Sequence, residues 1–192
     1  MYVRRLLLSR HHATSAAPPA VVAVGLGNMG SPLSARVAAK FAVAAYDLDA
    51  SLAEHCKASG SVAIGDAAQL QSYTATANVL LTCLPNTDAT RATLETVRPA
   101  LQPGLTWIDA TSGRAEDAAA LADELWERHG VRFLDCAVSG GPRGAAQGIL
   151  AAVCPSAASN AALTMAARHT APHAFGAGVG AAGGRRQAGL RG

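Results

Sequence analysis

Residues 20–30 read Ala-Val-Val-Ala-Val-Gly-Leu-Gly-Asn-Met-Gly, an apolar run that ends in three glycines with the spacing G-x-G-x-x-G. The pattern predicts a β-strand, a tight turn and the start of a helix, which is how parallel sheets bind the pyrophosphate of a dinucleotide. Asp47 follows Gly30 by 17 residues, at the end of a second apolar run over 41–46. A carboxylate placed there accepts hydrogen bonds from the adenosine ribose. The alternative is a strand-to-helix turn that binds no nucleotide, because glycines also close ordinary turns.

The chain has room for one ordinary domain and little more. It has 192 residues, half of them hydrophobic, which is enough for a sizeable core. All 13 acidic side chains lie between residues 47 and 135, so both ends are basic and the middle is acidic. Nucleic-acid binding is disfavoured, because the basic side chains are scattered and few aromatic residues accompany them. The 4 cysteines are widely spaced without a C-x-x-C pair, so we expect buried thiols and no metal site.

Residues 1–19 have the composition of an organelle transit peptide. Arginines, leucines and hydroxyl side chains occur there without a carboxylate, and the apolar core over 6–8 is too short for a secretory signal or a membrane span. We expect this leader to be cleaved and the protein to lie in the mitochondrial matrix, with a plastid as the alternative. A basic leader that is merely disordered is the remaining interpretation. No later stretch supplies an apolar run of about twenty residues, so no membrane contact is expected.

From residue 20 onward, apolar runs alternate with amphipathic stretches, as in repeated βαβ units. This alternation predicts an α/β fold of the Rossmann type, with a doubly wound and mostly parallel sheet. We expect a cofactor-binding domain over 20–156, then an Ala/Gly/Arg-rich tail over 157–192 with one short helix followed by disorder. The expected strands are 20–25, 41–46, 62–64, 78–83, 105–108, 131–135 and 149–153. The expected helices are 32–40, 52–59, 88–97 and 116–129.

Two of these helices carry signals at their starts. Thr87 is the expected cap of the helix 88–97, and Ser112 or Gly113 is expected to open the helix 116–129. Apolar residues recur at four-residue intervals along the second of these helices, which indicates a stripe that faces the core. The stripe comprises Leu121, Leu125 and His129, with Trp126 beside them.

Three further segments end where parallel strands deliver residues to a ligand. Residues 79–86 are a buried strand that ends in a proline turn, and residues 107–112 are a strand that ends in hydroxyl side chains. Residues 134–148 supply a hydroxyl and small residues whose amides suit a substrate carboxylate. In this order and spacing, the segments resemble the β-hydroxyacid dehydrogenase family, and its 3-hydroxyisobutyrate-oxidising members most. The matching motifs are G-L-G-x-M-G at 25–30, L-P at 84–85, D-x-[ST]-[ST] at 109–112 and D-x-x-V-S-G-G-x-x-G-A at 135–145.

The resemblance implies NAD(P)-dependent oxidation of a short β-hydroxy acid, with hydride transfer to the nicotinamide. It implies that Asp47 holds the ribose and that Leu84 and Pro85 hold the middle of the cofactor. Ser112 lies on the nicotinamide side in this interpretation, although taken alone it is equally a helix cap. The implied pyrophosphate residues are Gly25, Leu26, Gly27, Asn28, Met29 and Gly30. The implied substrate residues are Ser139, Gly140 and Gly141, the last two of which form only a turn in the alternative reading.

The cofactor expected from this sequence is NAD rather than NADP. Asp47 and Asp49 put carboxylates where a 2′-phosphate lies in NADP, and no arginine stands next to them. Two negative charges at that place repel a phosphate, whereas a ribose hydroxyl donates a hydrogen bond to a carboxylate.

The family pattern is incomplete after residue 153. Members of the family carry a catalytic lysine and then a helical domain there, whereas the lysines of this sequence are Lys40 and Lys57, both in the cofactor half. No catalytic residue is therefore assigned, and a truncated dinucleotide-binding fragment without turnover is the alternative function. A missing helical domain predicts exposed apolar surface and self-association. The arginine-rich ending over 185–192 fits a shifted reading frame, which sequencing of the transcript tests.

Overall fold

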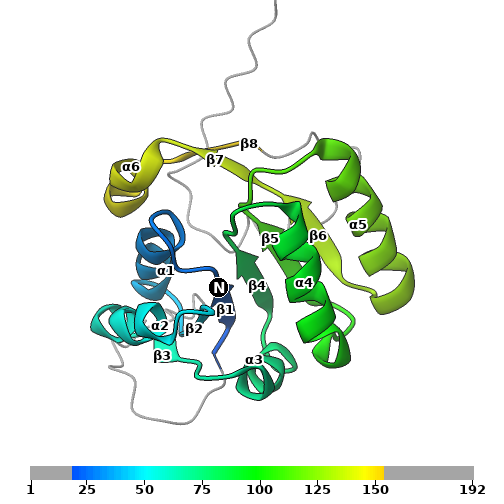
Figure 1. Ribbon diagram of the computed structural model, residues 1–192, viewed down its shortest axis with the longest axis horizontal. Coiled ribbons are helices and arrows are strands. Elements are labelled where there is room, and N and C mark those ends of the chain that lie inside the picture. The colour runs from blue at the N-terminus through cyan, green and yellow to red at the C-terminus, as the bar shows by residue number, and fades with distance from the viewer. Residues whose placement is uncertain (1–18, 154–192) are drawn as a thin grey trace, which may run out of the picture. The chain divides into compact units, whose positions relative to one another are not determined.

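The computed structural model describes residues 19–153, which form a six-stranded sheet flanked by helices (Figure 1). The strands are β1 (Val21–Val24), β2 (Val43–Tyr46), β3 (Val62–Ala63), β4 (Val79–Thr82), β5 (Thr106–Asp109) and β6 (Arg132–Asp135). Their order is β3-β2-β1-β4-β5-β6, and every pairing is parallel. The direction of winding reverses between β1 and β4, which leaves a crevice at their carboxyl ends, where doubly wound sheets bind ligands. The predicted Rossmann-type fold is confirmed.

Helices cover both faces of this sheet, and for that reason its strands are apolar on both sides. One face packs against α3 (Ala67–Thr74), α4 (Thr87–Val97) and α5 (Ala115–His129). The other packs against α1 (Gly30–Ala38) and α2 (Ala50–Cys56). Successive residues of β1 point to opposite faces, so Val22 lies in the first core and Val21 in the second. Trp107 is completely buried in the first core and meets Phe133 edge-on, with ring centroids 5.8 Å apart.

Side chains cap three of the helices. Asp49, Asp66 and Asn86 each accept a hydrogen bond from a backbone N–H in the first turn of α2, α3 and α4 respectively. Short 3₁₀ turns, η1 (Lys57–Ser59) and η2 (Arg98–Ala100), extend the carboxyl ends of α2 and α4. The first turns of α1 and α5 carry no capping side chain.

After β6 the chain leaves the parallel sheet. Strands β7 (Ala137–Ser139) and β8 (Ala151–Val153) pair antiparallel, and α6 (Gly141–Gln147) between them packs against α1. Gly148 ends α6 with a φ of +72°, and a Cβ placed there lies only 2.6 Å from a guanidinium nitrogen of Arg36 in α1. Glycine at 148 therefore permits the left-handed turn that ends α6.

The expected elements are present with small shifts at their ends, and three short ones were not predicted. The additional elements are α3, β7 and α6, and the strand expected at 149–153 pairs with β7 rather than with the parallel sheet. The cap predictions were wrong. Asn86 caps α4 and Thr87 is its first helical residue. Helix α5 begins at Ala115, and its N-cap is the extended residue Arg114, without a capping side chain, so neither Ser112 nor Gly113 opens the helix.

The predicted core stripe on α5 is only partly correct. Leu121 and Leu125 are buried, and His129 is half-buried. Trp126 is 60% exposed. It follows Leu125 by one residue, so it is turned about 100° around the helix, away from the core.

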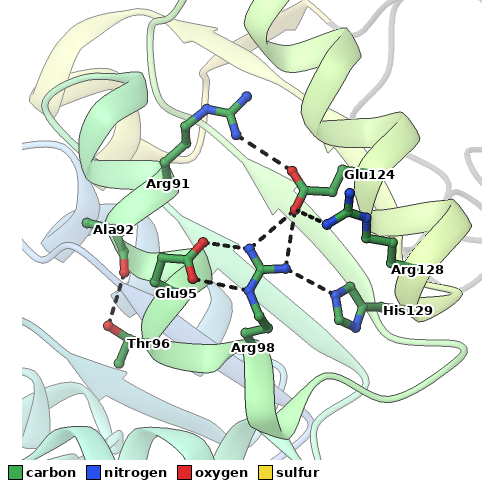
Figure 2. Close-up of polar contacts among 8 residues, drawn as sticks. All are labelled: Arg91, Ala92, Glu95, Thr96, Arg98, Glu124, Arg128 and His129. Atoms are coloured by element: carbon green, nitrogen blue, oxygen red, sulfur yellow. Dashed lines mark hydrogen bonds and ion pairs between the residues drawn. The ribbon is translucent and has the colours of Figure 1, made fainter.

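A cluster of charged side chains joins the outer surfaces of α4 and α5 (Figure 2). The Arg98 guanidinium donates to both Glu95 and Glu124, with an Arg98 Nη1 to Glu124 Oε1 distance of 3.2 Å. Arg91 and Arg128 lie 3.7 and 3.8 Å from the same Glu124 carboxylate. Glu124 is thus the shared acceptor that links the two helices across the surface.

Residues 1–18 and 154–192 lie outside the described part, so the predicted leader and the 157–192 tail fall there, as does Cys154. Of the other cysteines, Cys56 and Cys136 are buried and Cys83 is half-buried. Among the helices of residues 19–153, none has the length and apolar character to cross a membrane.

Candidate functional site

A cavity of about 750 Å³ lies beyond the carboxyl ends of β1, β2, β4 and β5. This is the position at which the strand order reverses, as expected for a ligand site in a doubly wound sheet. Within residues 19–153, the lining contains one carboxylate and no lysine, arginine or histidine. The predicted site residues that line the cavity are Gly25, Gly27, Asn28, Met29, Gly30, Asp47, Leu84, Pro85, Ser112 and Gly141.

The three glycines of the turn after β1 serve different purposes. Gly25 has a φ of +86°, and a Cβ there overlaps the Cys83 carbonyl oxygen. A Cβ at Gly30 overlaps the Gly25 carbonyl oxygen, because α1 starts directly against the turn. At Gly27, by contrast, a Cβ meets no atom within 4 Å and points into free space at the cavity. The fold requires glycine at 25 and 30, whereas glycine at 27 leaves the cavity floor open to something outside the chain.

The first turn of α1 faces this floor. Its N-cap residue is Met29, no side chain caps it, and no acidic residue occupies its first turn. Asn28, Met29 and Gly30 line the cavity beside it. A helix start of this kind attracts an anion, since its backbone N–H groups and dipole carry partial positive charge.

Asp47 is held rigidly at the mouth of the cavity. Its Oδ2 accepts a hydrogen bond from the Leu26 N–H at 2.6 Å, and its Oδ1 accepts one from the Asp49 N–H at 2.9 Å. The Leu26 amide is thereby engaged within the protein, and the Leu26 side chain is buried rather than exposed in the cavity. Each carboxylate oxygen still has a lone pair for a ligand hydroxyl, because one oxygen accepts two hydrogen bonds.

The opposite wall of the cavity comes from the ends of β4 and β5. Leu84 and Pro85 form a turn whose Leu84 N–H donates to Thr111 Oγ1 at 3.0 Å. Ser112 follows Thr111 and lines the cavity. The half-buried Cys83 is also part of the lining, and burial raises the pKa of its thiol, with the nearby Asp109 charge acting in the same direction. The thiol is therefore neutral at physiological pH.

Helices α3 and α4 form a further wall of the cavity that was not predicted from the sequence. This wall is apolar except for two threonine hydroxyls, and it suits a flat, weakly polar ring system. A sequence signal for α3 exists, since Asp66 Oδ1 accepts from the Gln69 N–H and Gln69 Oε1 accepts from the Gly65 N–H, close to a capping box. The residues of this wall are Leu70, Ala89, Ala92, Thr93 and Thr96.

The predicted substrate residues are divided between the cavity and its surroundings. Gly141, the first residue of α6, lines the cavity together with Val138 of β7. Ser139 is exposed at the end of β7, and Gly140, with a φ of +129°, precedes α6. Neither of these two residues belongs to the cavity lining. Residues 19–153 contain no group of His, Cys, Asp and Glu suited to hold a metal ion.

These features define a dinucleotide-binding domain of the Rossmann type: a glycine turn with an open floor, an uncapped helix start and a fixed carboxylate after the second strand. A family model described as the NAD binding domain of 6-phosphogluconate dehydrogenase matches residues 20–186. The chain belongs to this family, and its relatives include 3-hydroxyisobutyrate dehydrogenases, as the resemblance in the sequence predicted.

Similar proteins and structures agree with this assignment. Probable 3-hydroxyisobutyrate dehydrogenases of Mycobacterium bovis and Mycobacterium tuberculosis are 36% identical over 129 residues, 67% of this chain and 42% of theirs. The solved 3-hydroxyisobutyrate dehydrogenase of Mycobacterium tuberculosis with L-serine has a TM-score of 0.68 at 32% identity, covering 77% of this chain and 49% of that one. A structure in complex with NADP+ and 2-OPP has a TM-score of 0.66 at 25% identity, covering 76% and 52%. The chain thus spans about two-fifths of the length of the curated relatives it matches.

Proposed function

We propose that the cavity binds NAD(H) and that the chain supplies the cofactor half of a dehydrogenase of the 3-hydroxyisobutyrate type. The open position at Gly27 carries this proposal, because glycine is not needed there by the chain's own packing and the position faces the cavity. A pyrophosphate approaches backbone amides closely only where no Cβ intervenes. The residues of the turn therefore fit the cofactor that the family binds.

The residues around the turn have distinct roles in this proposal. The turn and the start of α1 hold the pyrophosphate through Gly27, Asn28, Met29 and Gly30. Gly25 lets the chain turn, and Leu26 acts through its bond to Asp47, whose carboxylate accepts from the ribose. Leu84 and Pro85 hold the middle of the cofactor, Ser112 lies on its nicotinamide side, and Ser139, Gly140 and Gly141 face the substrate. When bound, the cofactor supplies a hydride acceptor for the oxidation of a short β-hydroxy acid.

The site favours NAD over NADP in this proposal. Asp47 lines the cavity, and Asp49 donates its N–H to Asp47 Oδ1. Hydrogen bonds from Ser51 lower the pKa of the Asp49 carboxyl, so that it stays ionised and adds a second negative charge near the proposed ribose position. The cavity lining offers no described basic residue to offset a 2′-phosphate. One similar structure holds NADP+, so the preference is tested on this chain directly.

A second candidate is dinucleotide binding without turnover. Proton removal from a substrate hydroxyl needs a base within hydrogen-bond reach. Neither of the two lysines of the sequence lines the cavity: Lys40 is exposed after α1, and Lys57 pairs with Glu54 at 2.6 Å. An assay of 3-hydroxyisobutyrate oxidation by the full chain separates the two candidates. NADH formation supports the dehydrogenase, and cofactor binding without NADH formation supports the second candidate.

Cofactor titration tests the common part of both candidates. We expect NADH to bind the full chain and NADPH to bind at least about tenfold more weakly, measured by nicotinamide fluorescence. Gly27→Ala is expected to weaken NADH binding by about tenfold or more without loss of stability, because the added methyl occupies the cavity floor. Gly65→Ala is the matched control, since its Cβ makes only an ordinary contact at 3.8 Å and Gly65 does not line the cavity. Unaltered NADH binding by Gly27→Ala overturns the proposed site.

We also propose that the chain self-associates. On the sheet face that packs against α1 and α2, the neighbours Ile108 and Leu134 at the β5–β6 end are only half-buried. Apolar surface of this kind favours contact with a second protein surface. Light scattering of the purified chain tests this, and a monomer at all concentrations contradicts it.

The location proposed for the protein is the mitochondrial matrix. The acid-free, arginine-containing composition of residues 1–19 supports it. Fusion of this segment to a fluorescent protein, imaged with mitochondrial and plastid markers, distinguishes the two organelles. A diffuse signal contradicts both.

A further inference from the structure

A buried carboxylate lies directly behind the wall formed by β4 and β5. Asp109, the last residue of β5, is 7% exposed. Its Oδ1 accepts from Thr82 Oγ1 at 2.8 Å and from the Thr111 N–H at 3.0 Å. Its Oδ2 accepts from Thr90 Oγ1 at 3.1 Å. Asp109 therefore joins the ends of two strands to the first turns of α4.

The hydrogen bonds around Asp109 have a fixed direction. Trp107 Nε1 donates to Thr82 Oγ1 at 2.8 Å, which leaves the Thr82 hydroxyl proton free to reach Asp109. All three groups that touch the carboxylate are donors, and a carboxylate is the side chain that accepts on both of its oxygens. An amide at this position presents an N–H₂ group to one of those donors instead.

Two hydrogen-bond partners of Asp109, Thr111 and Thr90, are close in the chain to residues that line the cavity. Thr111 accepts the Leu84 N–H on its hydroxyl while its own N–H is held by Asp109, and Ser112 comes next in the chain. Thr90 is one residue from Ala89 and three from Thr93, both in the α4 wall. The Asp109 carboxylate thus links Ser112 and the Leu84–Pro85 turn, on one side of the cavity, to the α4 wall, although Asp109 does not line the cavity itself.

We infer that Asp109 is a positioning residue of the dinucleotide site, which sets the Leu84–Pro85 turn and Ser112 through Thr111 and sets α4 through Thr90. This inference rests on the proposed cofactor binding. We therefore expect the affinity for the cofactor to depend on three acceptor atoms outside the cavity: Asp109 Oδ1, Asp109 Oδ2 and Thr111 Oγ1.

The experiment compares NADH dissociation constants and thermal midpoints of the full chain and four variants. Thr111→Val removes the acceptor for the Leu84 N–H at nearly constant volume, and Thr111→Ser keeps it. We expect an affinity loss of about tenfold for Thr111→Val and Asp109→Asn, and of less than about threefold for Thr111→Ser. Thr74→Val is the matched control, since Thr74 is equally buried and its hydroxyl donates to Leu70 within its own helix. It is expected to lower the thermal midpoint and to keep the affinity.

The alternative results are distinct. Wild-type affinity in folded Thr111→Val and Asp109→Asn overturns the inference and leaves the proposed function intact. Equal losses in Thr111→Ser and Thr111→Val also overturn it, as does a loss in Thr74→Val as large as that in Thr111→Val, which indicates general destabilisation. If Asp109→Asn does not fold, the comparison of NADH affinity between Thr111→Val and Thr111→Ser tests the inference. Failure of the unmodified chain to bind NADH refutes the proposed function, and this inference falls with it.

Discussion

Asp47 and Asp109 stand at the same edge of one sheet, after β2 and at the end of β5, yet their surroundings are opposite. Asp47 is half-exposed, lines the cavity and accepts two backbone N–H groups. Asp109 is buried behind the cavity and accepts three buried hydrogen bonds, two from threonine hydroxyls and one from a backbone N–H. An aspartate at the carboxyl edge of the sheet can therefore bind a ligand or hold neighbouring strands and helices together. Which of the two it does depends on how many of its lone pairs already accept hydrogen bonds from the protein.

The largest expected effect is a difference in the free energy of unfolding between the alanine variants of Asp109 and Asp47. Asp109→Ala leaves the Thr90 hydroxyl and the Thr111 N–H buried without this acceptor, and it leaves the Thr82 hydroxyl only the long contact of 3.5 Å to the Ile108 carbonyl oxygen, which together are expected to cost about 3 kcal/mol or more. Asp47→Ala frees the exposed Asp49 N–H and the part-buried Leu26 N–H, and it is expected to cost about 1 kcal/mol. Urea unfolding at neutral pH measures both. Equal losses contradict the comparison.

The next effect is on the affinity for the cofactor, which is expected to depend directly on Asp47 because Asp47 lines the cavity. Asp47→Ala is expected to weaken NADH binding by about tenfold or more, because the hydrogen bond from a ribose hydroxyl to a charged acceptor is lost. Asp47→Asn is expected to reduce the discrimination against NADPH, since one negative charge disappears. Fluorescence titration with both cofactors measures this, and Asp88→Asn, at an exposed acid in the first turn of α4, is the control. An unchanged NADH affinity in Asp47→Ala places the ribose elsewhere.

A smaller effect concerns Asp135, which lies beside Asp109 in the β5–β6 register. Burial raises the pKa of the Asp135 carboxyl, and the Asp109 charge raises it further. A raised pKa in the folded state means that stability is complete below the ordinary value of about 4 and falls as pH rises through the folded pKa. Asp135→Asn is therefore expected to stabilise the chain at pH 7, by at most about 1 kcal/mol because solvent screens this half-exposed group. Urea unfolding at pH 7 and at about pH 3.5 tests this, and a gain of equal size at both values refutes it.

The smallest effect lies at Glu124, a surface carboxylate of α5 that contacts arginines of both α4 and α5 (Figure 2). Glu124→Gln weakens its contacts with three arginines and is expected to cost about 0.5 to 1 kcal/mol, decreasing with salt. Glu54→Gln, which breaks the single exposed pair with Lys57, is expected to cost less. Urea unfolding at low and high ionic strength measures both. An effect on NADH affinity at Glu124 contradicts the division between the cavity and this outer surface.

The sequence predicted the first half of the site better than the second. The turn over 25–30 and Asp47 depend on local rules, namely glycine where the backbone needs it and an acid after a strand. The α3–α4 wall escaped prediction, because Leu70 and Thr96 come together only when two helices pack on the same sheet face. The helix caps were misplaced by one or two residues, since Asn86 and Thr87 both suit a cap and only the backbone conformation chooses between them.

By itself the sequence determined the fold class and the position of the glycine turn over 25–30, because hydrophobic periodicity and glycine spacing act over short stretches of chain. Only the tertiary structure decided that Gly27 is open while Gly25 and Gly30 are closed, and that Asp109 is buried while Asp47 faces the cavity. Those differences depend on which strand ends and helices become neighbours across the sheet. Contacts between residues distant in the chain set burial and free space, and a local pattern does not specify them.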